Sequence, residues 1–206
     1  MMKVLMINGS PHARGTTWAA LHEMEQIFLA EGVEVELVQV GHLPVRGCTA
    51  CGFCKKNGYC VFDDCVNEVA AKLAECDGLV LGSPVYFASA NGTLTAFLDR
   101  LFYSCGEDLT MKVGASVAAA RRGGLTATFD QLNKYFTIRG MAVASGQYWN
   151  GIHGNNAEQA AQDGEGLQMM RTLARNMTFL MKSIALGRAE YGLPEKEPRI
   201  GTNFIR

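Results

Sequence analysis

Apolar residues along the chain fall into two alternating patterns. Short apolar runs rich in strand-forming residues end in glycine-containing turns, and between them apolar positions recur at helical spacing. The runs that predict strands are residues 3–7, 33–40, 78–84, 112–120 and 140–149. The segments that predict helices are about residues 17–31, 63–76, 92–104, 125–138 and 165–186.

Strands that alternate with helices must pair in parallel, with helices covering both faces of the sheet. Because crossover connections are right-handed, few arrangements remain. We therefore expect a three-layer α/β fold with a doubly wound, parallel, five-stranded sheet. Ligands of such sheets bind outside the carboxyl ends of the strands, where the strand order reverses. The loops after the first, third and fourth strands are therefore the candidate ligand loops.

Composition and charge exclude several classes of protein. The 206 residues carry a formal net charge of -1 and no long basic run, so we expect no nucleic-acid partner. The chain has no apolar run of the roughly 18 residues that a membrane-spanning helix requires. Its first residues lack the apolar stretch and cleavage site of a signal peptide. These features predict a cytoplasmic protein without a membrane partner.

The loop after the first strand, residues 8–17, leads through glycines and hydroxyl residues into a helix. Free backbone N–H groups and the positive end of a helix dipole favour a phosphate. The loop is not a Walker A motif, because five residues separate Gly9 from Gly15 and no lysine follows, and it lacks the three glycines of a dinucleotide-binding loop. We predict a site for a small phosphomonoester, and a plain turn with a helix cap is the alternative.

The other two loops suit a flat polar ring. Tyr86 and Phe87 follow the third strand, where a ring can stack on them or where they cap the core instead. The loop after the fourth strand has two arginines, Arg121 and Arg122, and two glycines. Donors there would favour a reduced flavin, whose pyrimidine edge gains negative charge, and solvated arginines are the alternative.

Four cysteines lie within one loop, residues 47–65, at short spacings: Cys48, Cys51, Cys54 and Cys60. Such spacings let thiolates surround a 4Fe–4S cluster, with Cys65 as a substitute for Cys60. Zinc, a thioredoxin-like redox pair and an empty loop are the alternatives. Seven cysteines cannot all pair within one chain, and Cys76 and Cys105 are expected to be buried apolar residues.

Several segments resemble the flavodoxin-like NAD(P)H-dependent FMN reductases, and more closely their iron–sulfur flavoprotein branch. They are "GSPHARGTT", "DGLVLGSPVYFASANGTLTAFLDR", "ARRGG" and the closing "GTNFIR". The resemblance implies a flavodoxin-like fold with strand order 2-1-3-4-5, FMN at the strand ends, and homodimers or homotetramers. The cysteine spacing is similar to the cluster motif of that branch, so the resemblance implies Cys48, Cys51, Cys54 and Cys60 as metal ligands.

The resemblance also implies which residues bind FMN. Four residues would hold its phosphate: Ser10, Arg14, Thr16 and Thr17. Five would lie along the ribityl chain and the ring: Pro84, Val85, Tyr86, Phe87 and Asn91. Three would meet the polar edge of the ring: Arg122, Gly123 and Gly124. Where the family often has an arginine and an asparagine, this chain has His12 and Thr16.

These features together predict an FMN-dependent oxidoreductase of the NAD(P)H-dependent FMN reductase or quinone reductase type. It would take electrons from NAD(P)H or a ferredoxin-like protein and pass them to a small-molecule acceptor, and no side chain is predicted to be catalytic. The alternative is a flavodoxin-like or iron–sulfur electron carrier between protein partners, and a redox sensor is a third hypothesis. Residues 1–188 would form the FMN-binding domain. Residues 189–206 would form an irregular tail on that domain or on a neighbouring subunit.

Overall fold

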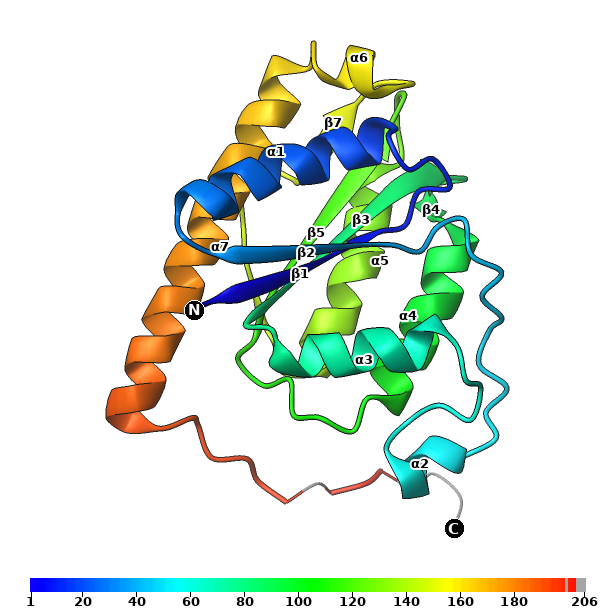
Figure 1. Ribbon diagram of the computed structural model, residues 1–206, viewed down its shortest axis with the longest axis vertical. Coiled ribbons are helices and arrows are strands. Elements are labelled where there is room, and N and C mark those ends of the chain that lie inside the picture. The colour runs from blue at the N-terminus through cyan, green and yellow to red at the C-terminus, as the bar shows by residue number, and fades with distance from the viewer. Residues whose placement is uncertain (199, 203–206) are drawn as a thin grey trace.

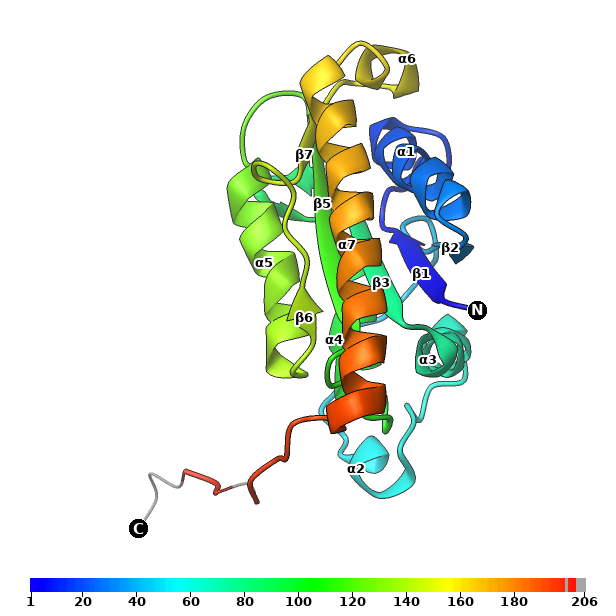
Figure 2. The ribbon, with the colours of Figure 1, turned by 90° about the vertical axis from the view of Figure 1, so that its left-hand side faces the viewer.

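The computed structural model describes residues 1–198 and 200–202. A parallel sheet lies between two layers of helices (Figure 1), and Figure 2 shows the long helix of residues 164–191 in front of the sheet. The strands are β1 (Lys3–Asn8), β2 (Glu34–Gln39), β3 (Gly78–Tyr86), β4 (Ser89–Ala90), β5 (Val113–Ala120), β6 (Ala142–Val143) and β7 (Gly151–His153). The helices are α1 (Thr16–Ala30), α2 (Phe53–Asn57), α3 (Cys65–Glu75), α4 (Gly92–Ser104), α5 (Leu125–Ile138), α6 (Ala157–Ala160) and α7 (Gly164–Tyr191).

The five principal strands lie in the order β2-β1-β3-β5-β6 (Figure 1). Counted without the two-residue β4, this order is the predicted 2-1-3-4-5, and the predicted α/β fold class is confirmed. The order reverses between β1 and β3, which pair in parallel with Val4 opposite Gly78 and Asn8 opposite Gly82. The carboxyl ends of these strands meet at one edge of the sheet, which we call the rim.

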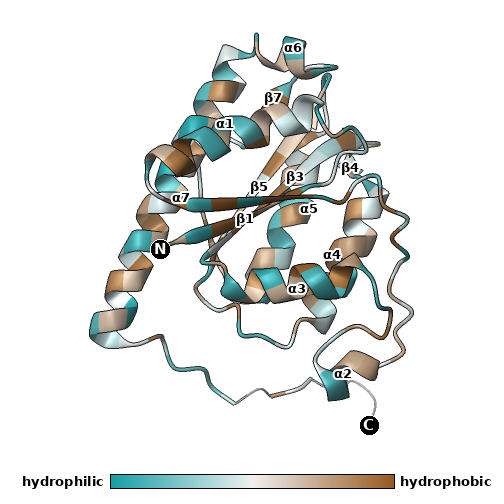
Figure 3. Ribbon diagram, viewed as in Figure 1, coloured by the Kyte–Doolittle hydropathy of each residue, from teal (hydrophilic) through white to brown (hydrophobic). Residues whose placement is uncertain are grey.

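Each face of the sheet buries its own core. Residues of β1, β3 and β5 that point to one face pack with α1 and α7, around Leu21, Met24 and Met177. Residues that point to the other face pack with α3, α4 and α5, around Leu5, Leu81 and Phe97. Figure 3 shows the corresponding apolar colour along the inner strands. The central strands are therefore apolar on both faces, as expected of a covered parallel sheet.

The predicted fifth strand, residues 140–149, is wrong in extent. Only Ala142–Val143 pair with the start of β5, and the chain then leaves the sheet. It returns as β7, which pairs with the end of β5 from Ala118 to Ala120. In the interruption the chain bonds to α7 instead, because the Ser145 carbonyl accepts from Asn176 at 2.7 Å, and Gly146 packs so closely that an added Cβ would lie 2.5 Å from Met169 Sδ.

The remaining differences from the predicted elements are small. α2 and α6 were not predicted, and both are single turns. The last helix ends at Tyr191, beyond the predicted domain end at residue 188. In the irregular segment that follows, Lys196 donates a 2.7 Å hydrogen bond to Asp108. The last four residues of the predicted tail, 203–206, lie outside the described residues. Within the described part of the chain, no helix has the length and apolarity needed to cross a bilayer.

Candidate flavin and cysteine sites

The three candidate ligand loops meet at the rim. Asn91 joins the first two, because its side-chain amide donates to the Gly9 carbonyl at 2.6 Å. Its own N–H donates to Ser83 Oγ at 3.0 Å, and its side-chain oxygen accepts from the Thr93 N–H to cap α4. The third loop touches the second at Gly124, where an added Cβ would lie 2.8 Å from a methyl group of Val85. Residues far apart in the sequence therefore form one edge.

Two helices start at the rim with their first N–H groups uncapped. Gly15 precedes α1 and Gly124 precedes α5, and neither provides a side-chain acceptor. The first turn of α1 also contains no acidic residue. By contrast, Asp64, Asn91 and Asp163 cap their helices with side-chain oxygens. The free N–H groups and positive helix dipole of α1 fit an anionic group such as the phosphate of FMN.

The residues predicted to hold the phosphate lie together in this loop, but their side chains differ. Ser10 is buried, and its hydroxyl oxygen accepts from the His12 N–H at 3.1 Å. The Thr16 hydroxyl lies 3.1 Å from the Gly154 carbonyl oxygen, to which it donates. Thr17 is buried beside Gly82, and Arg14 is exposed with its guanidinium carbon 6.0 Å from the Trp18 ring centroid. The backbone is therefore better placed than the side chains to bind an anion.

The predicted ring contacts lie on the hairpin of β3 and β4. Tyr86 is 43% exposed and Phe87 is 105% exposed, so the alternative in which both cap the core is wrong. Phe87 and Ala88 form the turn with positive φ angles of 52° and 57°, which is uncommon for residues other than glycine. Pro84 and Val85 precede the turn within β3. The hairpin thus presents aromatic surface to solvent beside the rim.

The loop after β5 is open to solvent. Both Arg121 and Arg122 are exposed, and no atom lies within 4 Å of a Cβ built on Gly123. Gly124 has φ +92° and packs on the hairpin, which only a residue without a side chain allows. All twelve predicted FMN contacts therefore lie on the rim loops or the hairpin, and their contact with FMN stays a prediction.

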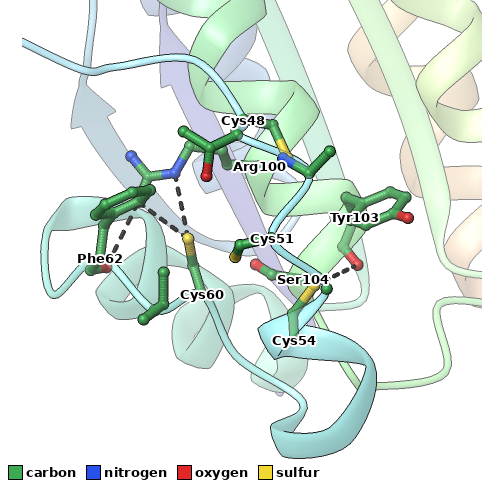
Figure 4. Close-up of a pocket in the computed structure, with 12 residues that line it drawn as sticks. Cys48, Cys51, Cys54, Cys60, Phe62, Arg100, Tyr103 and Ser104 are labelled. Atoms are coloured by element: carbon green, nitrogen blue, oxygen red, sulfur yellow. Dashed lines mark hydrogen bonds between the residues drawn. The ribbon is translucent and has the colours of Figure 1, made fainter.

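A second site lies on the other side of α4. The four predicted metal ligands, Cys48, Cys51, Cys54 and Cys60, line one small open pocket together with residues of α4 (Figure 4). Cys65, the predicted substitute, begins α3 and is not among the residues that line it. Within the described residues, no three His, Cys, Asp or Glu side chains are arranged to hold a metal ion. The cluster therefore stays a prediction.

The backbone of the cysteine loop is held by its neighbours. The Cys60 N–H donates to Asn67 Oδ1 at 2.9 Å, and the Cys60 carbonyl accepts from Asn67 Nδ2 at 2.9 Å. Gly106, just after α4, donates its N–H to the Gly58 carbonyl at 3.2 Å. Gly52 and Gly58 flank α2 with φ angles of 73° and 76°, so the chain can fold back within a few residues.

Arg100 and Asp64 form a charged pair beside this pocket that the sequence reasoning did not predict. Arg100 is 1% exposed, and it donates to the two carboxylate oxygens of Asp64 at 2.7 and 2.9 Å. Burial alone would raise the pKa of Asp64, but the bonds from Arg100 and the Val66 N–H outweigh it, and the pKa is lowered. Burial likewise opposes the charge of Arg100, yet its bonds to Asp64 and Cys60 raise its pKa. A buried charge in an apolar helix such as α4 was the available signal.

The pocket also contains an unsatisfied hydroxyl. Ser104 is 4% exposed and lines the pocket, and its Oγ has no hydrogen-bond partner within the described residues. Buried hydroxyls are normally paired, so one without a partner needs an explanation. Four soft thiols beside a free hydroxyl donor fit an iron–sulfur cluster, whose sulfur atoms accept hydrogen bonds.

Comparison with known proteins identifies a family and a fold. The model of the family described as NADPH-dependent FMN reductase matches residues 2–155. An iron–sulfur flavoprotein of Methanocaldococcus jannaschii is 33% identical over 191 residues, covering 89% of this chain and 99% of that protein. An iron–sulfur flavoprotein of Methanosarcina thermophila is 30% identical over 192 residues, covering 91% and 99%.

Solved structures at lower identity share the fold. The crystal structure of RosB, which contains the bound intermediate 8-demethyl-8-formylriboflavin-5'-phosphate, has a TM-score of 0.72 at 15% identity and covers 99% of this chain and 92% of RosB. A flavodoxin from the domain Archaea has a TM-score of 0.60 at 14% identity and covers 88% and 99%. These likenesses agree with the order of the sheet described above.

Proposed function

Because the chain belongs to the NADPH-dependent FMN reductase family and to its iron–sulfur flavoprotein branch, we propose how it holds its flavin and where electrons enter. The protein is an FMN-dependent oxidoreductase. FMN binds at the rim, with its phosphate on the N–H groups that begin α1 and its ring beside the β3–β4 hairpin. The observation that carries this placement is the uncapped start of α1, at the sheet edge where the strand order reverses.

Each rim loop has a separate task in this proposal. The first turn of α1 and the Ser10 region bind and orient the phosphate. The exposed Tyr86 and Phe87 cover one face of the ring and keep water from it. Arg122 and the glycines after it place donors at the polar edge of the ring, where they favour the reduced form. The bound flavin supplies the transfer of electrons in pairs or singly, and no side chain of the rim needs to act as an acid or base.

The phosphate placement is tested by comparing FMN with riboflavin, which lacks the phosphate. Flavin-free protein is titrated with each ligand, and quenching of flavin fluorescence gives the two dissociation constants. Two charge-assisted hydrogen bonds are worth roughly 1.5–3 kcal/mol each, so FMN is expected to bind at least about a hundredfold more tightly. Arg14→Gln, at the exposed arginine of the loop, should weaken FMN binding by less than about fivefold. Equal affinity for FMN and riboflavin would remove the basis of this placement.

The electron donor follows from the family's description, and we propose NADPH as the co-substrate. Purified protein loaded with FMN is expected to oxidise NADPH under nitrogen when a quinone or free FMN is the acceptor. NADH in place of NADPH is the comparison for the choice of nucleotide. Absence of turnover with either nucleotide, while a reduced ferredoxin does reduce the bound flavin, would favour the electron carrier instead.

The cysteine pocket favours a second electron-transfer centre. We propose that Cys48, Cys51, Cys54 and Cys60 bind a 4Fe–4S cluster, as the names of the relatives suggest for those proteins. The pocket contacts the later turns of α4, whereas Asn91 at its start lies on the rim. Arg100 lies nine positions after Asn91 in the sequence, which is about 14 Å along a helix. A cluster would therefore occupy a site apart from the flavin phosphate.

The cluster is tested by metal analysis of two matched cysteine variants. Protein purified and reconstituted under nitrogen with iron and sulfide should hold about four of each per chain. Cys60→Ser is expected to lose the cluster, whereas Cys65→Ser should retain it, because Cys65 lies outside the pocket lining. Wild-type protein that takes up zinc and no iron would contradict the cluster. Retention of iron by Cys60→Ser together with its loss from Cys65→Ser would contradict the choice of ligand.

A further inference from the structure

Helix α4 carries two polar side chains on the side that contacts the cysteine pocket, and neither has a role at the rim. Arg100 is among the largest fully buried side chains of the described residues, and it lies in a helix whose other buried residues include Phe97, Leu98 and Leu101. Ser104, one helical turn later, is also buried. Buried polar groups cost free energy unless they are paired, so their contacts show what they serve.

Arg100 donates to two side chains, Asp64 and Cys60, and makes longer contacts of 3.5 and 3.4 Å with the carbonyl oxygens of Arg46 and Phe62. One edge of the guanidinium binds both oxygens of Asp64. On the other edge, Nε lies 3.3 Å and Nη2 lies 3.2 Å from Cys60 Sγ, and both donate to that sulfur (Figure 4). The planar guanidinium fixes these directions, because its N–H groups form a rigid fork.

Cys60 is held more firmly than the other thiols of the pocket. Its sulfur receives the two Arg100 bonds, and its backbone is fixed by the two Asn67 bonds described above. The Cys48 sulfur accepts only from the nearby Ala50 N–H at 3.4 Å. The Cys54 thiol donates to the Tyr103 carbonyl at the long distance of 3.8 Å.

We propose that Arg100 and Ser104 are positioning residues that set the reduction potential of the cluster, an inference that rests on the cluster proposed above. Arg100 donates two N–H groups to the Cys60 thiolate, and Ser104 donates its hydroxyl to a sulfur in the pocket. A cluster held there would accept one electron from a ferredoxin-like donor, and the added negative charge would spread over its sulfur atoms. Donors to sulfur stabilise the reduced form more than the oxidised form, so they raise the potential.

Arg46→Lys is a matched control for Arg100→Lys, because both arginines lie beside the same aromatic ring and lysine keeps the positive charge. The guanidinium carbons of Arg46 and Arg100 lie 4.3 and 5.2 Å from the centroid of the same Phe62 ring. Arg46 is exposed, and its side chain is not among the donors to Cys60 Sγ. Arg46→Lys and Arg100→Lys therefore make the same exchange beside one ring, and only the second removes the fork from the sulfur.

Ser104→Ala is the gentlest test, because the hydroxyl it removes has no hydrogen-bond partner among the residues that the structure describes. Cluster-free Ser104→Ala is expected to unfold in urea at the same midpoint as wild type or a higher one. The reconstituted variant should show a cluster potential more negative than wild type in an anaerobic titration followed by electron paramagnetic resonance. Arg100→Lys should shift the potential in the same direction, and Arg46→Lys should leave it unchanged.

A spectroscopic signature separates hydrogen bonding from a general change in structure. Exchange of the wild-type protein into D2O should shift the iron–sulfur stretching bands in the resonance Raman spectrum, because the bonds to sulfur are deuterated. The shift should be smaller in Ser104→Ala and in Arg100→Lys. If Arg100→Lys does not fold, Ser104→Ala still decides the role of Ser104, and a D2O shift that is absent from Ser104→Ala overturns the role of Arg100, whose N–H groups would remain in that variant.

The outcomes distinguish this inference from the cluster proposal. Wild-type protein that holds no iron after reconstitution overturns both. A Ser104→Ala variant with a full complement of iron and sulfide, but with the potential and the D2O shift of wild type, overturns the role of Ser104. The same result for Arg100→Lys overturns the role of Arg100 and leaves the cluster in place.

Discussion

The Asn91 side chain offers a sharp test of how the rim is held together. It does two separable things: it caps α4 by accepting from the Thr93 N–H, and it joins two loops by donating to the Gly9 carbonyl at 2.6 Å. Loss of an N-cap costs about 1 kcal/mol, and a buried carbonyl left unpaired costs about 1–3 kcal/mol. Asn91→Ala loses both, so it should reduce the free energy of unfolding by about 2–4 kcal/mol.

The variant Asn91→Ser separates the two contributions. Serine is as good an N-cap as asparagine but is too short to reach Gly9, so it should lose only the bond between the loops. Urea unfolding of the flavin-free protein gives both differences, and Asn91→Ala is expected to melt about 4–16 °C lower than wild type. FMN should bind Asn91→Ser about tenfold more weakly, because FMN binding must then order the two loops at a cost of about 1.4 kcal/mol.

Two results would refute this reasoning. If Asn91→Ala unfolds within about 0.5 kcal/mol of wild type, the rim is not held by this side chain. If Asn91→Ser matches wild type in both stability and FMN affinity, the bond to Gly9 does not order the loops for the ligand.

Three further predictions follow from packing and charge. Gly124→Ala should reduce the free energy of unfolding by about 2–4 kcal/mol and weaken FMN binding, because a φ of +92° and the 2.8 Å approach to the hairpin leave no room for a Cβ. Gly123→Ala, where a Cβ meets open space, should be neutral, and equal urea midpoints for the two variants would contradict this. Burial raises the pKa of Cys76 to about 11 from 9.0, so native Cys76 should resist iodoacetamide at pH 8, and rapid labelling at that pH would count against this. Its contribution to the free energy of unfolding should be present below pH 9 and lost between pH 9 and 11, and Cys76→Ala should abolish this dependence. The hydrogen bond from Lys72 lowers the pKa of Glu36 below 4.5, so this pair should stabilise the protein above pH 4.5 and cease to do so as the pH falls through the lowered pKa. The stability of Glu36→Gln should therefore depend less on acid pH, and an unaltered acid transition would show that the pair contributes nothing.

The sequence by itself determined the fold class and most element positions. Two predicted helices, residues 92–104 and 125–138, have the bounds found in the structure. Local signals suffice for such elements, because hydrophobic period, N-caps and glycine turns act over a few neighbouring residues. Such a local signal is found at α3, where the Asp64 side chain caps the helix by accepting from the Val66 N–H two residues later. The prediction of a continuous fifth strand was wrong because the chain bonds there to the distant helix α7, at the Ser145 carbonyl and the Tyr148 N–H, and not to β5.

Only the tertiary structure decided how the sites are assembled. The rim loops could be placed at one edge from the strand order, but the bond from Asn91 to Gly9 spans 82 positions and leaves no local pattern. The same holds at the cysteine pocket, where Arg100 reaches Cys60 across 40 positions. Spacing indicated which thiols share a loop, whereas the packing of α4 against that loop places the Arg100 donors on the Cys60 sulfur. Contacts between distant segments depend on how whole helices pack, and that information is absent from any short stretch of sequence.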